Sequence, residues 1–279
     1  MKTSLPTTSE TITFIGGGNM ASALIKGLIS GGFSPDQILV IEPSDQARTR
    51  ISQDFSIHCI EDPHSDNVWQ KSTLFVWAIK PQQMKEVCES LAPLCSSALH
   101  LSVAAGISSS SLCKWLTTER VVRAMPNTPA LIGLGQTGLF ARPSVSQVER
   151  EQVERLIKGT GQCIWLADET LLDAVTAVSG SGPAYVFYFL EALSQAGIEL
   201  GLSPDDSKQL AIGTFIGASQ LALNSQETLS TLRERVTSKG GTTEAALAHM
   251  QECNIAEGFK ESVKRAQEKA LELGSNYGK

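Results

Sequence analysis

The stretch Ile12–Ala21, ITFIGGGNMA, decides the fold of the first part of this chain. It places the pattern G-x-G-x-x-A directly after a short β-rich run, Thr11–Ile15, and directly before an apolar-periodic segment, Met20–Ile29. In a dinucleotide-binding turn, the first glycine (Gly16) permits the tight turn and the second (Gly18) lets the backbone approach a pyrophosphate. The closing alanine lets the helix pack close to the strand. The sequence therefore predicts a strand–turn–helix unit that binds a dinucleotide.

The start of the predicted helix is a favourable place for phosphate groups. The first N–H groups of a helix have no partner within it and carry partial positive charge. We therefore expect Gly16, Gly18, Asn19 and Met20 to contact the cofactor. Because glycines also serve ordinary turns, this prediction depends on the order strand, turn, helix.

Further strands alternate with helical segments through the first half of the chain. Apolar runs at Ile38–Ile41, Leu74–Ile79, Leu99–Val103 and Val121–Ala124 are typical of parallel strands that are covered on both faces. From Asp168 onward almost every window has helical periodicity. The pattern predicts an α/β Rossmann domain over residues 1–167, followed by an all-α substrate-binding and dimerisation domain over residues 168–279.

Two helical segments of the second half are apolar almost all round. They are Tyr185–Gly197 and Leu210–Leu223. Such helices need to be buried on most sides, and a domain of about 110 residues covers them poorly. The sequence therefore predicts a homodimer or a higher homo-oligomer.

The residues after the second strand bear on the choice between NAD and NADP. Glu42 closes that strand, and an acid there favours the 2′-hydroxyl of the NAD ribose. Ser44 and Arg48 instead offer ligands for a 2′-phosphate, with Arg50 as a further candidate. From the residues alone the choice stays open.

The composition excludes several classes of protein. The net charge is −6 and no basic cluster occurs, which argues against a nucleic-acid partner. The most apolar stretches are too short or too interrupted to span a membrane. The six cysteines contain no C-x-x-C pair and no histidine at ligand spacing, so we expect neither a zinc or other metal site nor a disulfide framework. We expect a soluble cytoplasmic protein with a small-molecule substrate.

Five strings taken together resemble one enzyme family. The first is the glycine loop, and the other four are Ala78–Gln82 (AIKPQ), Met125–Ala130 (MPNTPA), Ser179–Tyr185 (SGSGPAY) and Val236–Thr243 (VTSKGGTT). In this order they resemble pyrroline-5-carboxylate reductase, the last enzyme of proline biosynthesis. The resemblance covers nearly the whole chain, and the last string is the most specific.

The resemblance implies a reaction and a set of residues. The reaction is reduction of the C=N bond of 1-pyrroline-5-carboxylate to L-proline. The hydride donor is usually NADPH, and NADH is a possible alternative. The family motif assigns Ala78, Lys80 and Pro81 to the nicotinamide side of the cofactor, and it assigns Ser238, Gly241, Thr242, Thr243 and Glu169 to the substrate. Lys239 departs from the family pattern, which often has proline there.

The last string also makes chemical sense by itself. A glycine-rich turn leads into a predicted helix, Thr243–Met250, whose N-terminus suits a carboxylate. The Thr243 hydroxyl is the predicted catalytic group, because it can hydrogen-bond the ring nitrogen while hydride arrives at the adjacent carbon. The alternative is that Thr242 or Thr243 merely caps the helix.

Two other functions remain as rivals. A related reductase of another imine or of a hydroxy acid would need a catalytic Lys or His early in the second domain, and none occurs between Asp168 and Glu199. A non-catalytic NADPH-binding protein would bind the cofactor without turnover. The intact Gly240–Thr243 motif argues against that second rival.

Overall fold

The computed structural model describes residues 10–64 and 71–278 and divides into two compact units. The first contains the residues up to Ser181 together with those from Ala266 onward, and the second contains Gly182–Arg265. The first unit therefore extends beyond the predicted domain boundary at 167/168. Helix α6 (Leu171–Val175) explains the difference, because it packs against the strands β6 and β7 described next.

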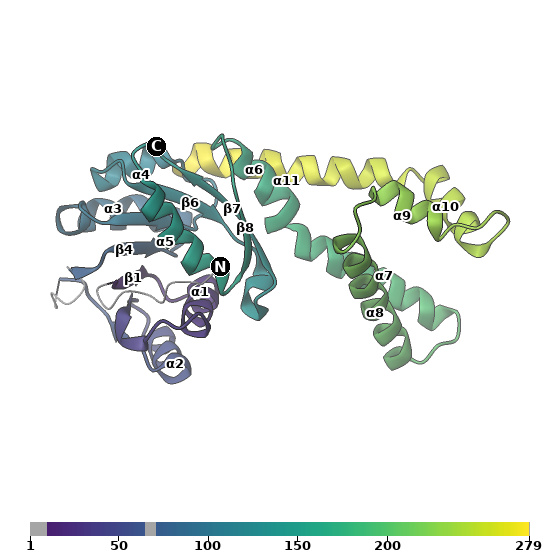
Figure 1. Cartoon of the computed structure of the whole chain (residues 1–279), viewed down its shortest axis with the longest axis horizontal. Coiled ribbons are helices and arrows are strands. Elements are labelled where there is room, and N and C mark those ends of the chain that lie inside the picture. Colours follow the sequence, from purple (N-terminus) through teal and green to yellow (C-terminus); the bar gives the residue numbers. More distant parts are fainter. Residues whose placement is uncertain (1–9, 65–70, 279) are drawn as a thin grey trace. The chain divides into compact units, whose positions relative to one another are not determined.

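One twisted sheet organises the first unit (Figure 1). Within the described residues its strand order is β3-β2-β1-β4-β5-β6-β7-β8, and neighbours run parallel except β6 and β7. The strands are β1 (Ile12–Ile15), β2 (Ile38–Ile41), β3 (His58–Ile60), β4 (Leu74–Trp77), β5 (Leu99–Ser102), β6 (Val121–Met125), β7 (Gly135–Ala141) and β8 (Gly161–Trp165). The order reverses between β1 and β4, which is where open α/β sheets bind ligands.

Helices cover both faces of this sheet. They are α1 (Asn19–Ser30), α2 (Asp45–Phe55), α3 (Pro81–Cys95), α4 (Ser109–Leu116) and α5 (Gln147–Lys158), with short turns at η1 (Pro35–Gln37), η3 (Thr128–Ile132) and the π-helical η4 (Thr176–Gly180). Helices α3 and α4 pack together, as do α1 and α5 (Figure 1). The predicted Rossmann architecture is confirmed.

Two hydrophobic clusters show how the central strands are buried on both faces. Phe14 and Val76 belong to one cluster, while their neighbours Ile15 and Trp77 belong to the other. Successive side chains of a strand point to opposite faces, so a strand that is apolar at every position needs cover on both sides. This burial fixes the carboxyl ends of β1, β4 and β5, where the candidate site lies.

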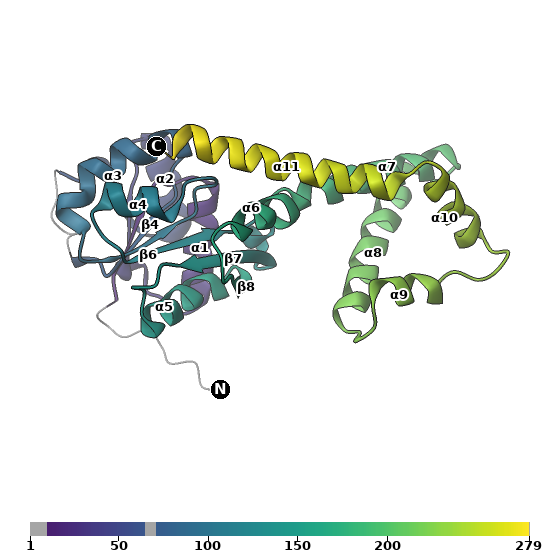
Figure 2. The same cartoon turned by 90° about the horizontal axis from the view of Figure 1, so that it is seen from above.

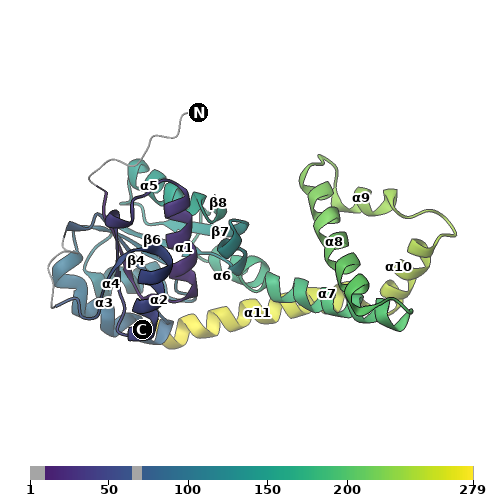
Figure 3. The ribbon, with the colours of Figure 1, turned by 90° about the horizontal axis from the view of Figure 1, so that it is seen from below.

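The second unit is entirely helical. Its helices are α7 (Gly182–Glu199), α8 (Pro204–Leu223), α9 (Leu229–Arg235), α10 (Thr242–Glu252) and the first part of α11 (Ile255–Tyr277). Helices α7 and α8 contact each other and follow one another along the chain (Figure 3), joined through a turn in which Gly201 has φ +98°. Helix α11 is one uninterrupted helix (Figure 2), and its last residues belong to the first unit.

The apolar helices of this unit are not buried within one chain. Phe187 of α7 is 66% exposed and Ile216 of α8 is 60% exposed. The predicted burial of Tyr185–Gly197 and Leu210–Leu223 is thus not met by the chain alone. A search of the described residues finds no helix with the length and apolar character that crossing a membrane requires.

Candidate active site

The glycine loop between β1 and α1 has the shape that a pyrophosphate needs. Gly16 has φ +98°, and a Cβ built on it would lie 2.6 Å from the carbonyl oxygen of Ala78. Gly18 precedes α1 as its N-cap, makes no side-chain cap, and has no atom within 4 Å of the position of a Cβ. No described side chain therefore caps the start of α1, and Gly18, Asn19 and Met20 fit a dinucleotide phosphate.

Glu42 connects this loop to the turn that follows β2. Its Oε2 accepts a hydrogen bond from Gly17 N at 2.7 Å, and its Oε1 accepts one from Ser44 N at 2.8 Å. The Ser44 hydroxyl in turn accepts a hydrogen bond from Ala47 N and caps α2. The Glu42 carboxylate is thus fixed at the end of β2, beside the glycine loop.

The two arginines that were candidate ligands of a 2′-phosphate have partners inside the protein. Arg48 Nη1 donates to the carbonyl oxygens of Glu42 (2.9 Å) and Pro43 (2.8 Å). Its Nη2 contacts Asp45 and Glu61. Arg50 Nη2 donates to the carbonyl oxygen of Gly17 at 2.9 Å. Both guanidinium groups therefore hold the backbone of the site in place.

A cavity begins at the glycine loop and continues between the end of β2 and helix α3. Its lining includes Gly16, Glu42, Glu61, Ile79 and Glu86. Because it joins the glycine loop to the end of β2, where dinucleotide-binding sheets hold the ribose, it suits the adenosine half of a dinucleotide.

The residues assigned to the nicotinamide side lie at the end of β4. Ala78 N donates to the carbonyl oxygen of Ile15 at 2.8 Å, which holds Ala78 against β1. Lys80 is the extended, exposed N-cap residue of α3, and Pro81 is the first residue of that helix. Proline suits this position, since its fixed φ matches the helix and its missing N–H would have no partner there. The structure brings Ala78 beside Gly16.

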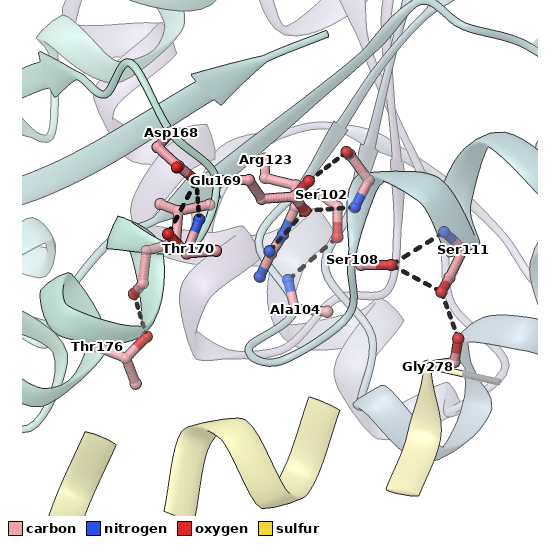
Figure 4. Close-up of polar contacts among 12 residues, drawn as sticks. Ser102, Ala104, Ser108, Ser111, Arg123, Asp168, Glu169, Thr170, Thr176 and Gly278 are labelled. Atoms are coloured by element: carbon pink, nitrogen blue, oxygen red, sulfur yellow. Dashed lines mark hydrogen bonds and ion pairs between the residues drawn. The ribbon is translucent and has the colours of Figure 1, made fainter. Parts of the chain in front are cut away.

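Glu169 lies in a polar network at the carboxyl ends of β5 and β6 (Figure 4). Its carboxylate accepts hydrogen bonds from Ser109 N and Oγ, each at 2.5 Å, and from Arg123 Nη1 at 2.8 Å. Burial raises the pKa of Glu169, but the Ser109 hydrogen bonds and Arg123 outweigh it and leave the pKa below its ordinary value. Nearby, burial raises the pKa of Asp173.

The C-terminal end of α11 packs on the loop between β5 and α4. A Cβ on Gly274 would lie 2.6 Å from the carbonyl oxygen of Gly106, and one on Gly106 would lie 2.9 Å from Gly274 N. Ser111 Oγ donates to the carbonyl oxygen of Gly278 (Figure 4). The two backbones can approach this closely only because both positions are glycine.

The predicted substrate residues Ser238–Thr243 lie in the second unit, ahead of α10. Helix α10 begins at Thr242, and Gly241 is its N-cap residue. Thr242 and Thr243 are therefore the first two helical residues, and neither of them caps the helix. Ser238 Oγ lies 2.5 Å from the position of a Cβ on Gly241, at the start of the helix. Within the described part of the chain, the Thr243 hydroxyl makes no hydrogen bond.

Comparisons with known proteins agree with this arrangement. The chain is 42% identical to a pyrroline-5-carboxylate reductase of Pseudomonas aeruginosa, covering 96% of this chain and 98% of the relative, and 40% identical to one of Haemophilus influenzae, covering 93% and 94%. The chain belongs to the pyrroline-5-carboxylate reductase family. Residues 169–273 match the family described as pyrroline-5-carboxylate reductase dimerisation, and residues 11–106 match the one described as NADP oxidoreductase, coenzyme F420-dependent.

Solved structures of pyrroline-5-carboxylate reductases have the same fold. The structure from Coxiella burnetii superposes with a TM-score of 0.88 at 36% identity, covering 95% of this chain and 99% of the other. The structure from Plasmodium falciparum, which has NADP bound, superposes with a TM-score of 0.85 at 26% identity, covering 95% and 98%. The predicted order of a Rossmann domain and a helical dimerisation domain is therefore confirmed for this family member.

One feature of the site, the support of the Glu169 carboxylate, was not found from the sequence. Arg123 and Ser109 hold Glu169 from positions far away along the chain, and no local pattern marks them. In the MPNTPA string, the side-chain amide of Asn127 accepts a hydrogen bond from Gln136 N and donates to Ser179. No group of three or more potential metal-ligating side chains occurs among the residues described.

Proposed function

We propose that this chain reduces 1-pyrroline-5-carboxylate to L-proline with a reduced nicotinamide dinucleotide, NADPH or NADH, as hydride donor. The observation that carries the proposal is the start of α10. There Ser238 and an unbonded Thr243 hydroxyl flank a helix N-terminus, in a chain that also has an open dinucleotide loop. When bound, the nicotinamide supplies the hydride.

The start of α10 is proposed to hold the substrate carboxylate. The first N–H groups of a helix attract anions, and the Ser238 hydroxyl adds a donor beside Gly241. The structure supports this role, since none of the described side chains caps the helix. Holding one end of the imine orients the C=N bond, and such alignment lowers the barrier to reaction.

Thr243 is proposed to act on the chemical step. Its hydroxyl can contact the ring nitrogen, which changes from a protonated imine to a more basic amine as hydride arrives at the adjacent carbon. A contact that differs between the ground state and the transition state changes kcat. Because a protonated imine already carries positive charge, the site needs alignment more than a strong general acid.

Glu169 is proposed to be a positioning residue in this reaction. The resemblance assigned it to the substrate, but its carboxylate oxygens accept hydrogen bonds from Ser109 and Arg123. It therefore ties the start of α4 to β6, at the edge of the sheet where the nicotinamide half of the site is expected.

We also propose that the active protein is a homodimer or a larger homo-oligomer in the cytoplasm. The exposed apolar side chains of α7 and α8 support the association, because side chains such as Phe187 and Leu221 are 66% and 70% exposed in the single chain. A second copy of the helical unit is the simplest cover for them. The cytoplasmic location rests on the sequence, whose cysteines are all unpaired in the structure.

The proposal is tested by following NAD(P)H oxidation with pyrroline-5-carboxylate, other cyclic imines and keto acids. Thr243→Val is expected to lower kcat by roughly ten- to a hundredfold, equivalent to about 1.4–2.7 kcal/mol. Ser238→Ala is expected to raise mainly the KM for the imine. Thr237→Val is the matched control, because its hydroxyl is bonded to the Arg233 carbonyl oxygen. Wild-type kcat in a folded Thr243→Val enzyme would refute the catalytic assignment.

A further inference from the structure

We infer that the adenosine side of the cofactor cavity is built for an unphosphorylated ribose, so that this chain uses NADH at least as efficiently as NADPH. We further infer that Glu42 sets this selectivity. Only the turnover measurement in its test rests on the proposed function, because cofactor binding can be measured without the imine. The sequence left this choice open between Glu42 on one side and Ser44 and Arg48 on the other.

The first observation is the placement of the Glu42 carboxylate. It lies at the end of β2 and lines the cavity, and hydrogen bonds from Gly17 N and Ser44 N hold it there. A carboxylate has about four acceptor sites, so about two remain for hydroxyl donors. The 2′- and 3′-hydroxyls of a ribose are such donors, whereas a 2′-phosphate is an acceptor with charge of like sign.

The second observation is that the two arginines closest to Glu42 along the chain already have partners among the described residues. Arg48 already contacts two backbone carbonyl oxygens and two carboxylates, and Arg50 already donates to Gly17 O. Releasing Arg48 would leave the Glu42 and Pro43 carbonyl oxygens without this donor and would loosen the turn that positions Glu42.

The third observation is the charge of the cavity wall. Glu42, Glu61 and Glu86 all line the cavity, and no lysine or arginine is among the described residues that do. His64 also lines it, with its Nε2 3.4 Å from Ser90 Oγ on α3. A phosphate would thus meet a wall with three carboxylates and no described lysine or arginine, and repulsion of like charges in a partly dehydrated cavity lowers its affinity.

The experiment measures the dissociation constants of NADH and NADPH by quenching of the intrinsic fluorescence of the full-length protein, without the imine. The kcat/KM values for both cofactors are then measured with pyrroline-5-carboxylate. The wild type is expected to bind NADH at least as tightly as NADPH. Glu42→Ser is expected to shift the affinity ratio toward NADPH by about tenfold or more.

Two further variants make the result specific to Glu42. Glu42→Gln removes the charge but keeps an oxygen for one of the two N–H donors, and it is expected to shift the ratio in the same direction by a smaller factor. Glu86→Gln removes an equal charge from α3, which also lines the cavity, and is expected to change the ratio by less than about threefold.

Two results would overturn the inference. One is a wild type that binds NADPH about tenfold or more tightly than NADH. The other is a folded Glu42→Ser protein with an unchanged affinity ratio. If the Glu42 variants fail to fold, the wild-type ratio alone decides. A protein that binds NADH in this way but does not reduce the imine contradicts the proposed function and leaves the inference intact.

Discussion

Lowering the pH from 7.5 to 5 is expected to destabilise this chain through one buried imidazole. His100 lies in β5, fully buried, and its ring contacts those of Phe75 and Trp77. Trp77 Nε1 donates to His100 Nδ1 at 3.1 Å, so Nδ1 is the acceptor, and Nε2 lies 3.1 Å from the carbonyl oxygen of Cys95. These contacts assign the single ring proton to Nε2.

The magnitude follows from the shift of the His100 pKa. Burial is the largest cause and lowers it from 6.5 to about 4, against the opposing effect of the hydrogen bond to Cys95. Between these values the unfolded chain binds a proton that the folded chain does not, so the free energy of unfolding falls as the pH falls. The contribution is complete above about pH 6.5, and about 2 kcal/mol of it is lost by pH 5 and about 3 kcal/mol by pH 4.

Urea unfolding at fixed protein concentration, between pH 5 and 7.5, measures this loss. His100→Asn is expected to be less stable at every pH but to have a flatter pH dependence, whereas His58→Asn removes an exposed histidine and is expected to keep the wild-type slope. The pH is kept at 5 or above so that protonation of Glu149, Asp168 and Glu169 does not add to the measured loss, because the pKa values of these three groups are lowered in the fold. A folded protein in which nitrogen NMR shows His100 titrating near pH 6.5, or equal slopes for wild type and His100→Asn, would refute the reasoning.

Three further outcomes are expected. Gly274→Ala should lower the melting temperature, because its Cβ would meet the Gly106 backbone. Gly258→Ala is the control in the same helix, and with no atom within 4 Å of its Cβ it should raise the free energy of unfolding by up to about 1 kcal/mol. Equal effects of the two substitutions in calorimetry would contradict the packing. Glu169→Ala should cost about 3 kcal/mol in urea unfolding by leaving Arg123 buried and unpaired, and a neutral effect would argue against the ion pair. Sedimentation at micromolar concentration should show a dimer or larger, and a stable active monomer would end that proposal.

The central strands could be predicted from sequence because each is a continuous apolar run. Strands β1, β2, β4, β5 and β6 all lie where apolar residues follow one another, since each is covered on two faces. Strands β3, β7 and β8 were not predicted. They lie toward the two edges of the sheet, and residues such as Gly135, Gln136 and Gln162 interrupt the apolar pattern. The antiparallel pairing of β7 with β6 has no local sequence mark.

The glycine loop is the part of the site that the sequence determined by itself. The requirement at Gly16 is a local one, a positive φ in a turn between one strand and the next helix, so it appears as a short motif at fixed spacing. The turn before α10 is local in the same sense. Its residues are consecutive, and the helix that follows them is formed by hydrogen bonds between near neighbours.

Only the tertiary structure decided which charged groups are available to a ligand. Arg48 and Glu42 stand six residues apart, and the sequence offered both as cofactor ligands, but the fold uses the Arg48 guanidinium to hold two carbonyl oxygens and the carboxylate of Glu61. Glu169 likewise meets Ser109 and Arg123 across the ends of two strands. A side chain's free hydrogen-bonding capacity depends on every group within about 3 Å of it in space, and the order of residues does not contain those distances.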